Sequence, residues 1–320
     1  MSGILATFFI LYLVSSFCFN ASTMKRYGGT LLKCESGILR TNLRIILYLI
    51  GLIFGSFVVV SSLDVVQRFI PEFPSVGPIL AMLVLIFISE FFFNFFDKKG
   101  TLGLSVSKKR LMEGVEGLNY GAVIFIACLL PSLLTGSIDP FTNMPGRLNP
   151  SLLGEMFGIL IIAALFEEVL FRGYIFRTLT YTCPAWIPLT LSSFIFSYVH
   201  WNQAVLTGEG DTLQWLFRIN VFLAGWIMAK LIIRTGNLWY AWWWHFSWNF
   251  IQGPILGISV SGTDIGTEFG AIYKEGNDLI TGGSIGIEAS LPATIILYLA
   301  IIKEKEITQF FKIKKIQAKK

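Results

Sequence analysis

Long apolar runs follow one another along most of this 320-residue chain, separated by short links. A helix needs about 20 mostly apolar residues to cross about 30 Å of hydrocarbon. By that length rule, the candidate spans are residues 3–19, 43–63, 76–96, 118–135, 152–179, 185–201, 213–234, 237–258 and 288–303. The pattern predicts an all-α fold, a polytopic membrane helix bundle with eight or nine transmembrane helices. The smaller number applies if residues 1–19 do not insert.

The composition agrees with a membrane protein rather than a soluble one. Hydrophobic residues make up 54% of the chain and charged residues only 14%, whereas a soluble domain usually carries about 25% charged residues. The formal net charge of +5 is modest. The four cysteines form no C-x-x-C pair, so neither a disulfide framework nor a cysteine metal site is predicted.

Lysine and arginine are concentrated in alternate links, which predicts the orientation of the spans. The basic residues of the first and third links are Lys25, Arg26, Lys33, Arg40, Arg44, Lys98, Lys99, Lys108, Lys109 and Arg110, and seven lysines follow residue 302. Cytoplasmic loops carry such an excess of positive charge. We therefore expect an integral multi-pass protein of the plasma or inner membrane, with its basic C-terminal tail in the cytoplasm.

Two adjacent carboxylates and an arginine interrupt the fifth apolar run, at Glu167, Glu168 and Arg172. Ionisable residues inside a span are costly and by default indicate a functional site. On a helix, Glu168 and Arg172 are spaced i,i+4 with the glutamate first, so they can neutralise each other. Glu167 lies about 100° away round the helix, where a buried carboxylate suits a general acid or base. The alternative is that all three residues form one structural charge cluster.

The chain has only two histidines, and both lie in apolar runs. His200 ends the run Phe196-Ser-Tyr-Val-His200, and His245 begins His245-Phe-Ser-Trp-Asn249. The members of each i,i+4 pair share one helical face. A single histidine in such a run is more often a structural core residue, but two of two, together with an asparagine and a glutamate pair, favour a site. We expect Glu167, His200, His245 and Asn249 to converge on one cavity of the bundle.

These residue types support the addition of water to a peptide carbonyl. A carboxylate beside an imidazole can deprotonate water, while a second imidazole and an amide N–H can hold the developing oxyanion. No G-x-S-x-G sequence surrounds a serine. A catalytic Zn²⁺ site made of Glu167, His200 and His245 is the metal alternative, although no H-E-x-x-H motif supplies it.

The three motifs together resemble those of the CPBP family, the CAAX proteases and bacteriocin-processing enzymes also called the Abi family. Glu167-Glu168-x-x-x-Arg172, Phe196-x-x-x-His200 and His245-x-x-x-Asn249 match in order and spacing, as do Gly173 and the lead Asn237-Leu238-Trp239. The resemblance covers about residues 150–300. It implies an intramembrane glutamic endopeptidase without a cofactor. Glu167 and His200 would activate water, His245 and Asn249 would form the oxyanion hole, and Glu168 and Arg172 would brace the site.

The resemblance also suggests a division of the chain. Residues 1–140 would be N-terminal transmembrane spans, residues 150–303 the catalytic membrane domain, and residues 304–320 a basic cytoplasmic tail. The expected partners are membrane lipid and a protein or peptide substrate, with no nucleic acid. Two other readings stay open: a non-catalytic immunity or scaffold protein that keeps the motifs, and a proton-coupled transporter whose buried ionisable residues relay protons.

Overall fold

The structure is a computed structural model, and it describes residues 43–55, 58, 76–96, 102–180, 184–264, 271–273 and 277–311. The predicted span 3–19 and most of the basic tail lie outside these residues. Helices joined by turns and loops make up most of the described part, and its strands are one pair of two residues each, which confirms the all-α prediction. Strand β1 (Ile138–Asp139) pairs antiparallel with β2 (Ile272–Tyr273).

The chain divides into two compact units. The first unit comprises Met1–Leu104 and Leu165–Leu189, and the second comprises Ser105–Ala164 and Thr190–Lys320. Two helices, α7 (Pro150–Arg172) and α9 (Trp186–Leu206), contribute residues to both units. The three motifs are therefore distributed, with the Glu-Glu-Arg motif in the first unit and the two histidine motifs in the second.

The first unit contains the helix Leu43–Gly55, α4 (Val76–Phe96), the end of α7 and α8 (Tyr174–Thr180). Its core is aromatic. The fully buried ring of Tyr174 lies 4.8 Å from the ring of Tyr48 and 4.9 Å from that of Phe93, measured between centroids. The Tyr48 hydroxyl is hydrogen-bonded to Ser89 Oγ over 2.7 Å. These contacts attach α8 to the two earlier helices.

The predicted span 152–179 is not one straight helix, because the chain turns between α7 and α8 at Gly173. The Gly173 N–H still donates to the Val169 carbonyl, at 3.0 Å. A Cβ atom on Gly173 would collide with that same carbonyl oxygen, so this turn requires glycine.

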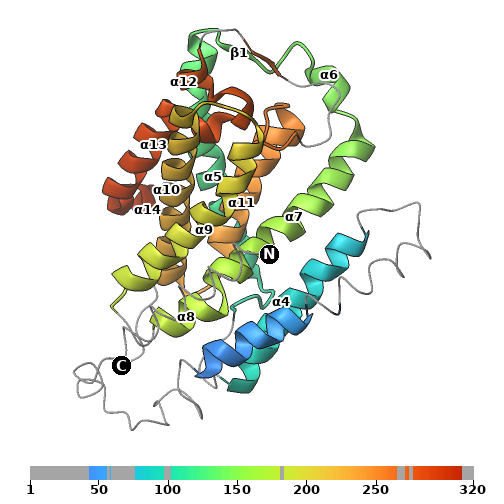
Figure 1. Cartoon of the computed structure of the whole chain (residues 1–320), viewed down its shortest axis with the longest axis vertical. Helices are drawn as coiled ribbons and strands as arrows, with labels where there is room; N and C mark the ends of the chain where they lie inside the picture. Colours follow the sequence, from blue (N-terminus) through green and yellow to red (C-terminus); the bar gives the residue numbers. More distant parts are fainter. Residues whose placement is uncertain are drawn as a thin grey trace. The chain divides into compact units, whose positions relative to one another are not determined.

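The second unit contains most of the helices. In chain order they are α5 (Lys108–Leu134), α6 (Met144–Arg147), the start of α7, all but the first turn of α9, α10 (Asp211–Thr235), α11 (Trp239–Phe250), the π-helix η1 (Ile251–Ile255), α12 (Asp278–Thr281), the 3₁₀ turns η2 (Gly283–Ile285) and η3 (Ile287–Ala289), α13 (Leu291–Ile302) and α14 (Glu304–Phe310). In Figure 1, α11 lies beside α5, and α10 beside α13.

Helix α5 begins at Lys108, ten residues before the apolar run that predicted it. The difference arises because its first turns contain charged residues, which lie outside an apolar run. Ser107 caps this early start, since its hydroxyl accepts a hydrogen bond from the Arg110 N–H at 3.3 Å. A serine at this position satisfies one of the amide groups left unpaired at a helix start. The charged turns therefore extend α5 beyond its apolar part.

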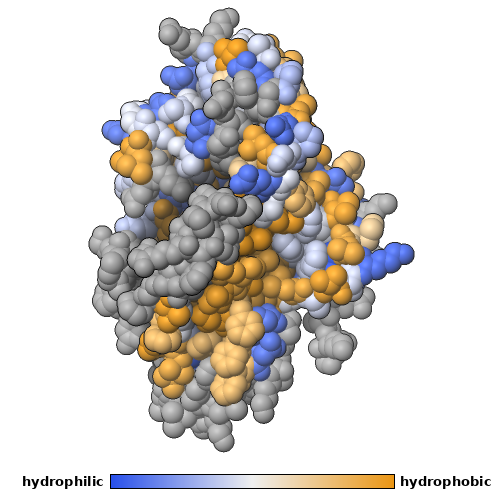
Figure 2. All heavy atoms as spheres, turned by 90° about the vertical axis from the view of Figure 1, so that its right-hand side faces the viewer, coloured by the Kyte–Doolittle hydropathy of each residue, from blue (hydrophilic) through white to orange (hydrophobic). Residues whose placement is uncertain are grey.

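Two described helices, α5 and α10, are long and apolar enough to cross a membrane by length and composition. Shorter apolar helices occur at Leu43–Gly55, Met82–Phe95 and Leu291–Ile302. Figure 2 shows many exposed apolar side chains on the face drawn. On α4 alone, Phe87 is 70% exposed and Phe95 is 62% exposed. Large apolar side chains exposed in this way fit contact with lipid. The total of eight or nine spans stays a prediction.

Candidate functional site

The second unit places the histidine motif of α11 on a row of glycines in α5. A Cβ atom on Gly117 would lie 2.5 Å from the Tyr240 carbonyl oxygen, and one on Gly121 would collide with the Trp244 carbonyl oxygen and with Ser247 Oγ. Small residues at such an interface let two helix backbones approach closely, as in many membrane proteins. The backbone of α11 just before His245 therefore rests directly on α5.

The first half of α7 holds α11 from another direction. Trp242 Nε1 donates a hydrogen bond to the Ile161 carbonyl oxygen at 2.7 Å. Phe246, which is 2% exposed, packs against Leu160 and Ala164. The helix backbone on either side of His245 is therefore held by α7 as well as by α5.

Helices α9 and α11 bring the two histidines to one phenylalanine. The ring centroid of Phe196 lies 4.4 Å from that of His200, and 5.9 Å from that of His245 with the two planes at 90°. Phe196 is buried, His245 is 6% exposed, and His200 is half-buried. The sequence predicted that these two imidazoles would lie close together, and the structure brings both to the same side chain within the second unit.

The tautomer of His200 follows from its hydrogen bond. Its Nδ1 lies 2.8 Å from the Phe196 carbonyl oxygen. A carbonyl oxygen can only accept, so Nδ1 carries the hydrogen. In a neutral imidazole the other nitrogen then has a lone pair. His200 Nε2 is consequently the atom that can accept a proton or a hydrogen bond from water.

Asn249 lies one turn after His245, where α11 gives way to a π-helix. The predicted span 237–258 is thus regular only as far as Phe250, because η1 begins at Ile251 and includes Pro254. Single π-turns inside helices occur frequently at functional sites. Asn249 is half-buried at the end of the regular part, so the wider turn directly follows a motif residue.

In the first unit, the ion pair predicted from the i,i+4 spacing is present. Arg172 Nη1 donates to Glu168 Oε1 at 3.0 Å, and both side chains are 0% exposed. Glu167 is half-buried. Arg172 also interacts electrostatically with Glu167, less strongly than with Glu168. The arginine therefore interacts with both carboxylates, whereas the helical spacing predicted only its pair with Glu168.

The six predicted site residues thus form two groups, each described within its own unit. Glu167, Glu168 and Arg172 belong to the first unit, whereas His200, His245 and Asn249 belong to the second. The convergence of Glu167 with the histidines stays a prediction. Among the described residues, no group of three or more histidine, cysteine, aspartate or glutamate side chains is arranged to hold a metal ion.

The sequence motifs did not single out the glycine row of α5, because glycines carry no reactive group. A pair of alanine variants tests its importance. Gly121→Ala is expected to lower the stability by about 1–3 kcal/mol, because the added methyl overpacks the α5–α11 contact. Gly158→Ala on α7 is the matched control, since its Cβ would meet nothing within 4 Å. Thermal unfolding in detergent measures both. Equal melting temperatures for the two variants would contradict the close contact.

Comparison with known families agrees with the motifs. Residues 149–251 match the family model described as Type II CAAX prenyl endopeptidase Rce1-like. The matched residues include all three motifs, from Glu167 to Asn249, and the match confirms the resemblance to the CAAX proteases. No curated protein and no solved structure shows a significant match. The family match indicates an intramembrane endopeptidase.

Proposed function

We propose that this CAAX-protease-like chain hydrolyses a peptide bond of a protein or peptide at the membrane, using a water molecule activated by Glu167 and His200. The observation that carries the proposal is the arrangement around Phe196. Two imidazoles contact its ring, and its carbonyl oxygen accepts from Nδ1 of one of them. That one is His200, whose Nε2 can therefore accept a hydrogen bond from water.

The reaction begins with removal of a proton from water by the Glu167 carboxylate, while His200 Nε2 holds the same water by accepting its second hydrogen. The water oxygen forms a bond to the peptide carbonyl carbon, and the carbonyl oxygen becomes an oxyanion. The C–N bond then breaks, and the protonated carboxyl group returns its proton to the leaving amine nitrogen. General acid–base catalysis of this kind contributes about 10²- to 10⁴-fold to the rate.

The oxyanion requires donors that are already in position before the reaction. His245 and Asn249 supply a ring N–H and an amide N–H from one face of α11, whose position is set by α5 and by Trp242. Removing one such donor costs about 2.7–4 kcal/mol of transition-state stabilisation in a characterised protease. In this scheme Glu168 and Arg172 hold the end of α7, and neither takes part in proton transfer.

The first substrate to test follows from the description of the matched family, which is that of a prenyl endopeptidase. A peptide whose cysteine carries an isoprenyl chain would enter from the lipid phase, and the apolar surface of the protein fits such a route. The full chain would be reconstituted in liposomes and offered farnesylated and unmodified forms of one C-a-a-X peptide. Mass spectrometry would detect the released tripeptide.

Cleavage of either peptide by the reconstituted protein, and none in protein-free liposomes, is the expected result. Preference for the farnesylated form would assign the lipid as part of the substrate. The proposal would be contradicted if neither peptide is cleaved and membrane peptidomics finds no fragment that is present in wild-type cells and absent from Glu167→Ala cells. A proton flux into the same liposomes that is lost in Glu167→Ala would instead favour a transporter.

Metal chelation separates the proposed mechanism from its metal alternative. Incubation with 1,10-phenanthroline and then with EDTA is expected to change the cleavage rate by less than about twofold, because a carboxylate and an imidazole suffice to activate water. The measurement is the initial rate before and after dialysis of the chelator. Loss of activity that Zn²⁺ restores would show instead that Glu167, His200 and His245 act as ligands.

A further inference from the structure

Among the described residues, Arg218 is the cation of α10 that forms no ion pair with a carboxylate. The other two cations of this helix, Lys230 and Arg234, both contact Glu304, at 2.5 Å and 3.8 Å between nitrogen and oxygen. Arg218 lies two turns after the start of α10, and its Nε is buried without a hydrogen-bond partner. A cation inside an apolar helix is costly unless an anion accompanies it. An anion from outside the chain would therefore stabilise Arg218.

Two tryptophans hold the guanidinium of Arg218. Its Cζ lies 3.0 Å from the ring centroid of Trp201 on α9 and 4.4 Å from that of Trp215 on α10. An indole face attracts a cation through its quadrupole. The N–H groups of a guanidinium lie in its own plane, so stacking on a ring leaves them free to donate to an oxygen at the edge. The two indoles thus fix the cation without satisfying its donors.

The backbone that carries Arg218 is fixed from two sides. The Arg218 carbonyl oxygen accepts from Ser197 Oγ of α9 at 2.7 Å. Two residues later, Asn220 Nδ2 donates to the Glu288 carbonyl oxygen at 2.8 Å and to the Ser290 carbonyl oxygen at 2.9 Å, both just before α13. The position of the guanidinium is therefore set by the helices of the second unit before any ligand arrives.

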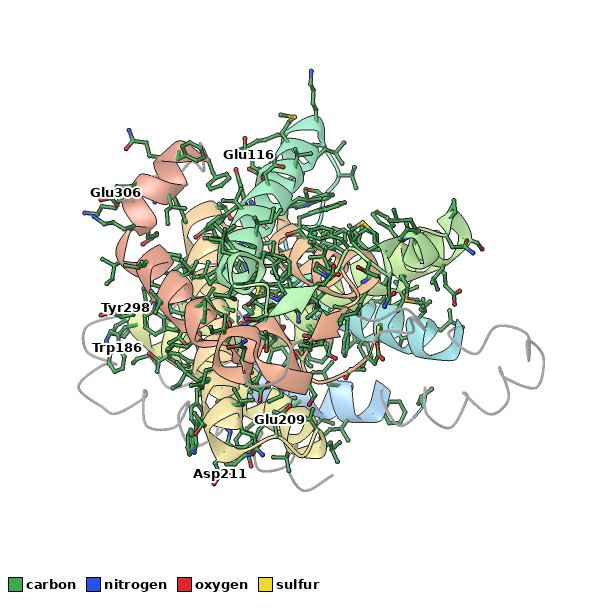
Figure 3. The ribbon with its side chains drawn as sticks, turned by 90° about the horizontal axis from the view of Figure 1, so that it is seen from above. Glu116, Trp186, Glu209, Asp211, Tyr298 and Glu306 are labelled. Atoms are coloured by element: carbon green, nitrogen blue, oxygen red, sulfur yellow. The ribbon has the colours of Figure 1, made fainter. Side chains whose placement is uncertain are left out.

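The surface of α10 changes from charged to apolar over its first turns. Asp211, which begins the helix, is exposed, and Figure 3 shows it beside Glu209, pointing away from the helices. Asp211 attracts Arg218 only from beyond ion-pair distance. The next turns expose large apolar side chains, with Trp215 58% and Ile219 44% exposed. Tryptophan is enriched where the headgroups of a membrane meet its hydrocarbon, so the composition here fits that boundary.

We propose that Arg218, framed by Trp201 and Trp215, binds the phosphate group of a phospholipid whose acyl chains lie along the exposed apolar side chains of α9 and α10. Two N–H groups on one edge of the guanidinium can donate to two phosphate oxygens. The charges are complementary, because the cation lacks an ion-pair partner among the described residues and a phosphodiester carries one negative charge. The site does not depend on the proposed function, since a lipid can bind here whether or not a peptide is cleaved.

The test titrates the full chain in detergent with dioleoyl-phosphatidylglycerol and counts bound lipids by native mass spectrometry. Arg218→Gln removes the charge and is expected to raise the Kd at least fivefold. Dioleoylglycerol, which lacks the phosphate, is expected to bind wild type and Arg218→Gln equally. Arg218→Lys should restore part of the affinity, because an ammonium keeps the charge but not the planar two-point contact. A rise of less than fivefold for Arg218→Gln would overturn the proposal.

Lys109→Gln is the matched control for charge. Lys109 lies at the start of α5, and its side chain is 80% exposed. Its replacement removes the same single charge without touching the two tryptophans, so the Kd is expected to stay within twofold of wild type. If Lys109→Gln weakens binding as much as Arg218→Gln does, the lipid responds to the net charge of the protein, and the site at Arg218 is refuted.

Trp215→Leu keeps the test decisive if Arg218→Gln lowers the melting temperature. This exchange removes one of the two rings that hold the guanidinium and leaves an apolar side chain on the surface. The Kd for dioleoyl-phosphatidylglycerol is expected to rise at least threefold with the melting temperature unchanged, and a smaller rise would count against the site.

A peptide carboxylate is the competing anion, because Trp201 directly follows His200 in the sequence. Farnesylated C-a-a-X peptides that end in a free carboxylate or in an amide separate the two ligands. If Arg218→Gln raises KM for the carboxylate form alone and leaves lipid binding unchanged, Arg218 serves the peptide and the proposal is wrong. The lipid titration needs no cleavage, so its failure is distinguishable from a failure of the proposed function.

Discussion

Replacing Glu167 with glutamine is expected to lower kcat for peptide hydrolysis about 10²- to 10⁴-fold, the range attributed to general acid–base catalysis. Glutamine keeps the size of the side chain and its hydrogen-bonding oxygen, but an amide cannot accept a proton from water. KM should change little, because Glu167 acts on the water and not on the substrate. Single-turnover rates in liposomes measure the effect, with the melting temperature as the check on folding.

Glu155→Gln is the matched control for that result. Glu155 lies on the same helix, α7, and is exposed, so its replacement is expected to leave the rate within twofold of wild type. A Glu167→Gln protein that retained more than a tenth of the wild-type rate would show that another group removes the proton. The role of His200 and of the oxyanion donors would then need to be assigned anew.

Arg172→Met should produce the largest loss of stability, about 3–5 kcal/mol, as found when one partner of a buried ion pair is removed. Arg172 and Glu168 are both 0% exposed and 3.0 Å apart, so the variant leaves a carboxylate inside the protein without its neutralising cation. Inside a membrane protein an uncompensated charge is costly as well. Denaturation in detergent, or abundance in the membrane fraction, measures the loss.

The double variant Glu168→Gln/Arg172→Met separates charge from packing. It has no charge at either position and is expected to recover most of the lost stability, because replacing both partners of a buried pair is often neutral. A double variant as unstable as Arg172→Met alone would show that the guanidinium contributes chiefly through its shape and its other contacts. In that case the pair would not be the brace that the motif suggests.

Part of this arrangement could be predicted from residue spacing. The apolar runs predicted helices, and the i,i+4 rule predicted the Glu168–Arg172 pair that the structure contains. The boundaries of the helices were harder to predict from the sequence. Nothing in the apolar run shows that Gly173 meets a carbonyl oxygen, because that depends on the turn itself. The charged start of α5 fails a hydropathy criterion, although residues of this kind form helices well.

Contacts between distant parts of the chain were beyond sequence reasoning. The residues that precede α13 are rich in glycine, serine and threonine, a composition typical of an irregular surface loop. At their end, the Glu288 carbonyl oxygen accepts from Asn220, 68 residues earlier, and the Glu288 carboxylate accepts from the Ser261 N–H. The π-turn at Ile251 likewise has no periodic signature, since Pro254 alone suggests only a helix end. Such features are set by tertiary packing, which a linear pattern does not encode.

The phenyl ring of Phe196 has a consequence for how the two histidines can be studied apart. One side chain contacts both imidazoles, at 4.4 Å and 5.9 Å between ring centroids, so a smaller side chain at this position would remove a packing surface from both rings at once. The proposed acceptor of water and the proposed donor to the oxyanion would then lose the same support together, and a replacement of Phe196 could not separate their roles.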